Sequence, residues 1–188
     1  DIGVETASLG IQVHGGMGFI EETGAAALLR DARIAPIYEG TNGIQAIDLV
    51  ARKLPQSGGE HVHGYIAELR AIVEGLRGSN DVALGRAPGK LADALADLEE
   101  ATRFLQSAMA EGRMETALAG ATPYLRLFAL AAGGAYLARG ALSGSSPERI
   151  ALCRFFADNM VGECRALKER VVEGADSLAA AGAALVNG

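Results

Sequence analysis

The 188-residue chain has a formal net charge of −6, and 49% of its residues are hydrophobic while 21% are charged. This balance is typical of a soluble globular protein with a sizeable core, and the negative charge excludes a global field that would attract nucleic acid or an anionic membrane. Only 5% of the residues are aromatic and Trp is absent, which favours closely packed helices built from Ala, Leu and Val. No charge-free run of 18 apolar residues occurs, so no membrane span is expected.

The N-terminal segment is expected to be helical from the start. Helix is predicted over residues 2–14 and ends at the glycine-rich residues 15–18, because glycine favours backbone conformations outside the helix. Thr23 can cap a second helix that runs to about Ile34, where Pro36 ends it. The chain has no initiator Met and no signal-peptide pattern, so we expect a fragment of a longer protein.

A third helix is predicted from Thr41, as its cap, through Leu54. The segment 55–59, Pro-Gln-Ser-Gly-Gly, reads as a linker after it. This change of character divides the chain into a first domain at residues 1–56 and a second at residues 57–188.

Beyond the linker the pattern is that of amphipathic helices, and no alternating strand pattern occurs, so the predicted fold class is all-α. Residues 123–142 are apolar almost all round, which predicts a buried central helix. Ser146-Pro147 should start one last long helix, with a cap followed by proline at the first helical position. A bundle-facing seam steps by four and three along Leu91, Leu95, Leu98, Thr102, Leu105 and Met109.

The two cysteines, Cys153 and Cys164, would lie on one face of that last helix, roughly 16 Å apart at 1.5 Å per residue. This separation is too long for a disulfide. We therefore expect both to be buried small hydrophobic side chains.

Residues 1–54 carry most of the chemistry. Tyr38-Glu39-Gly40 falls in a tight break between two predicted helices, where a carboxylate projects from a loop with rigid ends, a good placement for a general base. An apolar pocket around it would raise its pKa toward the working range. The glycine loop at 15–18 lets backbone approach a ligand closely, although it could also be a plain turn.

Three motifs together resemble a known family. They are Gln12-Val-His-Gly-Gly-Met-Gly-Phe19, Arg30-Asp-Ala-Arg33 and Tyr38-Glu-Gly-Thr41. They match, in residues and in spacing, the C-terminal helical domain of acyl-CoA dehydrogenases. The resemblance implies an up-down helical bundle of that type. The variant Glu-Gly-Thr-Asn-Gly-Ile-Gln and residues 116–175 resemble a subgroup with an additional C-terminal helical bundle, whose members act on long-chain acyl-CoAs or methylthiopropanoyl-CoA.

The resemblance also implies an FAD-dependent oxidoreductase of fatty acid metabolism. Glu39 would remove the α-proton of an acyl-CoA while the β-hydrogen leaves as hydride to flavin N5, and its backbone N–H would polarise the thioester carbonyl. Tyr38 and Gly40 would line the acyl site. The cofactor contacts would come from Gln12, Gly15 and Gly16 toward a neighbouring subunit's FAD and from Thr41 toward the subunit's own FAD.

Further implications concern the whole enzyme. The family members form homodimers or larger assemblies, and the implied setting is the bacterial cytoplasm with electron-transfer flavoprotein as the electron acceptor. Two departures stand out: Gly43 replaces a frequent cofactor-contacting glutamine and Ala46 a frequent arginine. Without the missing N-terminal and middle domains, the fragment alone should be inactive.

Two other classes of function remain open. One is an acyl-CoA dehydrogenase-like binding or DNA-associated damage-response protein, which the net charge of −6 disfavours. The other is a non-catalytic assembly module, which has no need of a carboxylate at Glu39. An acyl-CoA oxidase would be a variation on the dehydrogenase.

Several other residues are expected to be structural or solvated rather than functional. Arg30 and Asp31 should pair with neighbours, and His14 should be satisfied or exposed. No metal site is expected, because Glu60, His61 and His63 lie in a Gly-rich linker without a fourth ligand. An ordinary solvated face is predicted for Arg165, Lys168, Glu169 and Arg170.

Overall fold

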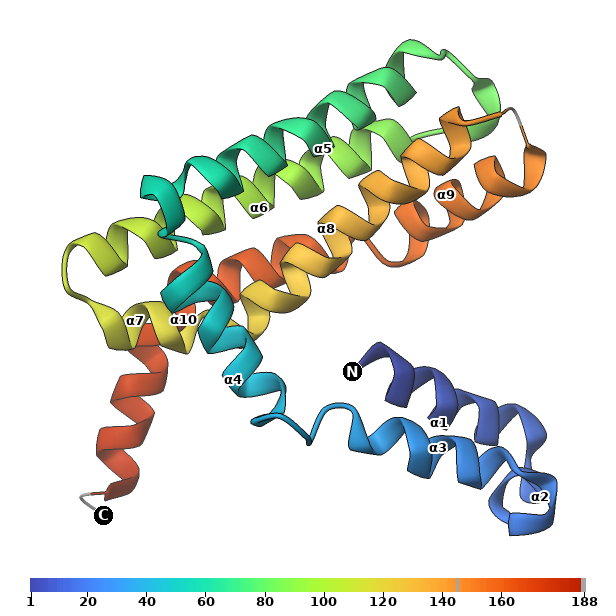
Figure 1. The fold of residues 1–188 in the computed structure, drawn as a ribbon, viewed down its shortest axis with the longest axis horizontal. Helices are drawn as coiled ribbons and strands as arrows, with labels where there is room; N and C mark the ends of the chain where they lie inside the picture. The colour runs from blue at the N-terminus through green and yellow to red at the C-terminus, as the bar shows by residue number, and fades with distance from the viewer. Residues whose placement is uncertain (145, 187–188) are drawn as a thin grey trace. The chain divides into compact units, whose positions relative to one another are not determined.

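The computed structural model describes residues 1–144 and 146–186. These residues form ten α-helices, three 3-10 turns and one π-helical turn, with no strand among them. The prediction of an all-α protein is therefore confirmed. By their contacts the residues divide into two compact units, 1–45 and 46–188 (Figure 1).

The first unit is a helical hairpin. Its elements are α1 (Ile2–His14), α2 (Gly16–Phe19), η1 (Glu21–Thr23) and α3 (Ala25–Ile34), and α4 (Thr41–Asp48) begins within it. The first helix ends where predicted, but the glycine break is narrower than predicted, because only Gly15 has a positive φ, of 60°, and α2 starts directly after it. The prediction that Thr23 caps the second helix is wrong: Gly24 holds the N-cap position, and the buried Thr23 hydroxyl has no hydrogen-bond partner.

The third predicted helix consists of two kinds of helix. The α-helix α4 ends at Asp48, and the π-helical turn η2 (Leu49–Lys53) continues it, closed by a hydrogen bond from the Leu54 N–H to the Leu49 carbonyl. The predicted linker is the tight turn η3 (Gln56–Gly59), in which Ser57, Gly58 and Gly59 all have positive φ.

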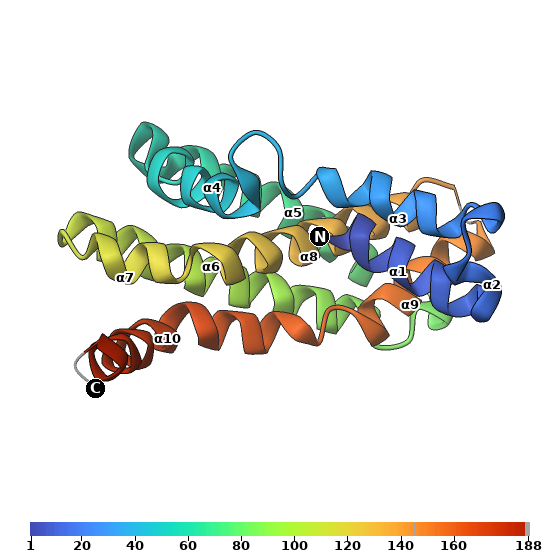
Figure 2. The same cartoon turned by 90° about the horizontal axis from the view of Figure 1, so that it is seen from below.

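The second unit is a four-helix bundle. Its arms are α5 (Glu60–Gly78), α6 (Ala87–Ala110), α8 (Ala121–Leu142) and α10 (Glu163–Val186), with η4 (Val82–Leu84), α7 (Met114–Ala119) and α9 (Pro147–Asn159) in the connections. Successive arms run in opposite directions (Figures 1 and 2). The arms contact one another around the bundle in the order α5, α6, α10, α8, and α6 also contacts α8 across it, an up-down arrangement.

The bundle core follows the predicted seam. Leu91, Leu95, Leu98, Thr102 and Leu105 are fully buried on α6, and Met109 is partly buried beside them. The central helix α8 is rich in small residues, which let the arms approach closely. At Gly134 an added Cβ would lie 2.5 Å from a methyl carbon of Leu91, so a larger residue where α8 meets α6 would require the Leu91 side chain to move. Ala46, Val50 and Leu54 belong to this same core.

The last long helix was predicted as a single helix, but the structure has two helices there, α9 and α10. The chain turns at residues 160–162, where the Met160 and Val161 N–H groups both bond the Phe156 carbonyl and α10 begins at Glu163. Cys153 therefore lies on α9 and Cys164 on α10; both are buried free thiols. Burial raises the pKa of both, that of Cys164 to about 12, so both are neutral and unreactive at physiological pH.

None of the helices in the described part of the chain combines the length and the apolar character needed to span a lipid bilayer.

Candidate active site

The predicted base lies in the connection between α3 and α4. Pro36 follows the end of α3, and the segment then turns sharply before α4 begins at Thr41. Asn42 ties this connection to the start of α1, because its side-chain amide donates a 2.7 Å hydrogen bond to the Asp1 carboxylate. The Asn42 N–H bonds the Pro36 carbonyl at 3.2 Å. The loop is thus anchored at both ends within residues 1–45.

The Tyr38–Thr41 segment is a β-turn with an uncommon backbone. The Thr41 N–H donates to the Tyr38 carbonyl at 3.3 Å, and the two central residues, Glu39 and Gly40, have φ values of 54° and 88°. Positive φ at both central positions is the pattern of a type I′ turn. For a glutamate it is uncommon, and such conformations concentrate at functional sites. Gly40 is needed here, since a Cβ would also crowd Ile44 at 3.3 Å.

The turn presents both groups that the resemblance assigns to catalysis. The Glu39 side chain is exposed, so no apolar pocket within the described residues encloses it. Its backbone N–H has no acceptor among those residues. A free N–H beside a free carboxylate can meet a carbonyl oxygen and the acidic C–H next to it in the same ligand.

The glycine loop contains two glycines that the local structure requires and one that it does not. Gly15 has φ 60° and ψ −143°, a region open to glycine. At Gly18 a Cβ would lie 2.4 Å from the Ile11 carbonyl oxygen, so this glycine lets α2 pack on α1. Gly16 has an ordinary φ and open space around it, so nothing in the described structure requires glycine there.

The predicted cofactor residues lie at opposite ends of the hairpin. Gln12, Gly15 and Gly16 are at the α2 end, while Thr41 follows the Glu39 turn at the other end (Figure 1). The ten residues of α3 separate the two ends by about 15 Å at 1.5 Å per residue. One hairpin therefore does not bring all four residues together on one small group.

The first unit has almost no core of its own. Only Gly18 and Ala25 are buried in residues 1–45, while large apolar side chains on α1, α2 and α3 are exposed. These exposed side chains include Leu9, Val13, Phe19, Leu28 and Ile34. An apolar surface of this extent on 45 residues is typical of an interaction face.

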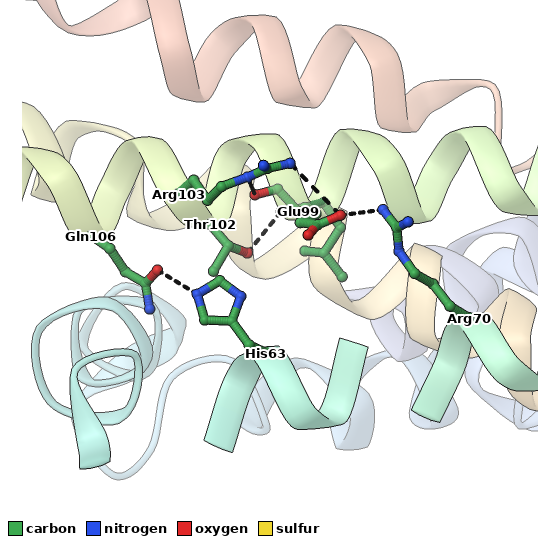
Figure 3. A network of polar contacts seen from close by, with 7 residues as sticks. His63, Arg70, Glu99, Thr102, Arg103 and Gln106 are labelled. Atoms are coloured by element: carbon green, nitrogen blue, oxygen red, sulfur yellow. Dashed lines mark hydrogen bonds and ion pairs between the residues drawn. The ribbon is translucent and has the colours of Figure 1, made fainter. Parts of the chain in front are cut away.

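Of the residues expected to be structural, Arg30 and His14 have local partners, whereas the prediction that Asp31 pairs with a neighbour is wrong, because its side chain has no hydrogen bond or ion pair among the described residues. Arg30 forms an exposed 2.9 Å ion pair with Glu21, and His14 Nδ1 contacts the Gly10 carbonyl at 2.9 Å. His61 and His63 lie in the first turn of α5, not in the linker as predicted. The His63 ring bonds the Gln106 side chain of α6 at 2.9 Å, beside the ion pairs of Glu99 with Arg70 and Arg103 (Figure 3). In the described part of the chain no three His, Cys, Asp or Glu side chains gather as metal ligands.

A buried carboxylate in the bundle escaped the sequence analysis. Asp97 of α6 pairs with Arg165 of α10 at 3.2 Å, and Lys168 pairs with Glu100 at 3.2 Å. The prediction of a solvated face is therefore wrong for Lys168, whose side chain is 12% exposed, while Arg165 is solvated as predicted but also joins two arms. Asp97 also lines a cavity of about 220 Å³ with Lys90, Asp93, Asp158, Gly162 and Arg165. Its position three residues after Ala94 and four before Ala101, on the apolar face of α6, was the available signal.

Two family profiles match the chain. The profile described as "Acyl-CoA dehydrogenase, C-terminal domain" covers residues 1–54, and "Acetyl-CoA dehydrogenase C-terminal like" covers residues 65–181. The chain belongs to the acyl-CoA dehydrogenase family. Its two matched regions correspond to the C-terminal domain and to the additional C-terminal region of that family, as the motifs indicated.

Relatives match it over different lengths. A 3-methylmercaptopropionyl-CoA dehydrogenase of Ruegeria pomeroyi is 40% identical over 186 residues, which cover 93% of this chain and 31% of that protein. A butyryl-CoA dehydrogenase of Syntrophomonas wolfei is 48% identical over 59 residues, 31% of the chain and 10% of that protein. A broad-specificity linear acyl-CoA dehydrogenase of Mycobacterium tuberculosis is 37% identical over 92 residues, which cover 47% of this chain and 14% of that protein. The chain thus spans about a third or less of these relatives.

Proposed function

We propose that this acyl-CoA dehydrogenase chain takes part in the FAD-dependent α,β-dehydrogenation of an acyl-CoA thioester, with Glu39 as the catalytic base. The observation that carries the proposal is the Tyr38–Thr41 turn, which holds Glu39 at φ 54° with its carboxylate and backbone N–H both free. This turn lies within the region matched by the family's C-terminal domain profile.

In the proposed reaction the Glu39 carboxylate takes the α-proton, and the Glu39 N–H bonds the thioester oxygen as negative charge develops on it. The C–H electron pair left at the α-carbon forms the new double bond as hydride leaves the β-carbon. When bound, FAD supplies the two-electron acceptor for that hydride. The product is a trans-2-enoyl-CoA, and Tyr38 and Gly40 would border the acyl chain beside the reacting carbons.

The chemistry of the assigned cofactor residues suits a flavin dinucleotide. Gln12 offers an exposed amide, Thr41 an exposed hydroxyl, and Gly15 and Gly16 an exposed backbone without side chains. These groups can donate to phosphate or ring acceptors. Their distribution over both ends of the hairpin supports contacts with two different FAD molecules, one of them bound by a neighbouring subunit. The exposed apolar side chains of residues 1–45 support the homodimer or larger assembly that this requires.

The remaining assignments follow the relatives. The names of the matched relatives include short, linear and thioether acyl-CoAs, so the substrate we propose is an acyl-CoA of this range. Electron-transfer flavoprotein in the bacterial cytoplasm would reoxidise the enzyme.

The test uses the full-length protein that contains this chain, with Glu39→Gln and, as a matched control, Glu22→Gln, another exposed glutamate of residues 1–45. Under anaerobic conditions, flavin absorbance is followed after adding 3-methylmercaptopropionyl-CoA, butyryl-CoA and a long-chain acyl-CoA. We expect the parent and Glu22→Gln to bleach with at least one of them. Glu39→Gln should bind the same acyl-CoA and remain oxidised.

Each other outcome has a distinct meaning. Equal bleaching by Glu39→Gln would place the base elsewhere and leave the family assignment intact. A full-length protein without flavin that binds DNA tightly, and more weakly as salt rises, would favour the damage-response alternative.

A further inference from the structure

Glu39 sits in the most strained backbone segment of residues 1–45. Three consecutive residues have positive φ: Glu39 at 54°, Gly40 at 88° and Thr41 at 73°. For the two that are not glycine, this left-handed conformation is unfavourable. Such a segment persists only when surrounding contacts hold it, so the residue that supplies those contacts controls where the Glu39 carboxylate points.

One side chain contacts the backbone of Glu39 itself. The Gln45 side-chain amide, on the second turn of α4, donates a hydrogen bond to the Glu39 carbonyl oxygen at 3.1 Å. The other bonds of the turn involve its neighbours: the Thr41 N–H to Tyr38, and the Asn42 N–H to Pro36. The Gln45 bond fixes the peptide plane between Glu39 and Gly40 relative to α4, and thereby the rotation that orients the Glu39 side chain.

We infer that Gln45 is a positioning residue for the proposed catalytic base, acting through the Glu39 carbonyl; this rests on the function proposed above. Gln45 keeps the turn in the one conformation that presents the carboxylate and the N–H of Glu39 together. Without its bond, the strained turn has other conformations open to it, and the carboxylate spends less time within reach of the α-proton. Misplacement of a reacting group by about 1 Å can reduce a rate by about 100-fold.

Gln45 does not take the place of the cofactor-contacting glutamine that Gly43 replaces. Residues two apart on a helix point to different sides, so the amide of Gln45 cannot occupy the direction of a side chain at position 43. Its amide nitrogen is also engaged with Glu39. Loss of Gln45 should therefore affect the proton-transfer step and leave cofactor binding unchanged.

The experiment uses the full-length protein with Gln45→Met, which keeps a long unbranched side chain but removes the donor. Gln56→Met is the matched control, because Gln56 is exposed and its side chain has no hydrogen bond to the described residues. Gln45→Lys is the rescue variant, since lysine can donate to the same carbonyl. Three quantities are measured: bound flavin per chain, the dissociation constant of the acyl-CoA that bleaches the parent, and the anaerobic rate of flavin reduction.

We expect Gln45→Met to reduce its flavin about 10- to 100-fold more slowly than the parent. Its flavin content and acyl-CoA affinity should equal the parent's. Deuteration of the substrate at the α-carbon should slow flavin reduction in the variant by at least the same factor as in the parent. Gln45→Lys should recover part of the rate, and Gln56→Met should behave as the parent. A Gln45→Met variant that reduces flavin at the parental rate, or whose slower reduction is matched by lost flavin or acyl-CoA, would overturn the inference.

Glu39→Gln, measured alongside, separates this inference from the proposed function. If Glu39→Gln is inert and Gln45→Met is parental, only the positioning role is wrong. If Glu39→Gln reacts at the parental rate, Glu39 is not the base, and the role of Gln45 falls with it.

Discussion

Asp97 of α6 and Arg165 of α10 form an ion pair with unequal burial. Their charged atoms are 3.2 Å apart, but the aspartate side chain is 5% exposed and the arginine side chain 59% exposed. Burial raises the pKa of Asp97 above its ordinary value, and the opposing effects of Arg165 and Lys168 do not cancel the shift, while Glu100 and Asp93 add to it. The charged form of Asp97 is thus less favourable in the bundle than in the unfolded chain. A pair of this kind is weak evidence for stability.

Asp97→Asn should therefore leave the protein as stable as the parent at pH 7, or more stable. A carboxyl whose pKa is raised by folding destabilises the folded state once pH exceeds the unfolded pKa, and the penalty is complete above the folded pKa. The advantage of the Asn variant should shrink as pH falls toward about 4, near the ordinary Asp pKa. Urea unfolding at a series of pH values measures it. A variant that is less stable at pH 7 would show that the Arg165 pair outweighs burial.

Arg165→Met should act in the opposite direction. It leaves the Asp97 carboxylate buried without its nearest cation, and we expect a loss of about 1–3 kcal/mol in the free energy of unfolding at pH 7. Arg170→Met, an exposed position on the same helix, should change it little. Equal effects of the two substitutions would mean that the pair contributes nothing.

Thr102 and Tyr124, both fully buried, should respond unequally to the loss of their hydroxyls. The Thr102 hydroxyl donates to the Leu98 carbonyl at 2.7 Å, so its single proton is used and the Tyr124 hydroxyl, 2.7 Å away, must be the donor to Thr102. Thr102→Val leaves the buried tyrosine hydroxyl without an acceptor and should lower the free energy of unfolding by about 1–3 kcal/mol. Tyr124→Phe should lower it by about 1 kcal/mol. The double variant should lose less than the sum. Chemical denaturation tests the order, and a larger loss for Tyr124→Phe would contradict it.

Gly16→Ala and Gly18→Ala should have different effects, because Gly18 makes a contact within the chain whereas Gly16 is proposed to contact FAD. In the full-length protein, Gly18→Ala should unfold at lower temperature, with a loss of about 1–3 kcal/mol, because its Cβ would meet the Ile11 carbonyl. Gly16→Ala should keep the parental melting temperature. If Gly16 faces the FAD of a neighbouring subunit, as proposed, this variant should still lose bound flavin, which absorbance reports. Parental flavin content would remove Gly16 from the proposed cofactor contacts.

The division of the chain at residues 56 and 57 stays a prediction, and protein expression can test it. Ala46, Val50 and Leu54 are each 1% exposed or less within the bundle core. A chain starting at residue 46 should therefore unfold cooperatively, and one starting at residue 57 should be less stable by several kcal/mol, as for large-to-small core substitutions. Thermal unfolding followed by circular dichroism compares them. Equal stability would favour the boundary at 56.

The local sequence pattern alone was sufficient to predict the buried face of α6 and the family of the chain. The seam from Leu91 to Leu105 repeats with the period of a helix, so the buried face could be predicted without knowing what covers it. The Tyr-Glu-Gly-Thr motif pointed to the same family that the profile matching residues 1–54 indicates. The role of Glu39 as base stays a proposal.

Features that depend on the folded backbone conformation or on partners distant in sequence were decided by the tertiary structure. Asp97 is buried because α10 lies across it, and the break at residues 160–162 divides one continuous apolar pattern between two helices. Thr23 had the right residue type for a cap, but Gly24 takes the position in a left-handed conformation that suits glycine. Glu39 has a positive φ in a turn whose carbonyl accepts from Gln45 and whose following residue, Asn42, bonds Asp1 at the start of the chain. Periodicity records which side of a helix is apolar, whereas the direction of a strained backbone or the partner of a charge is fixed only when separate segments meet.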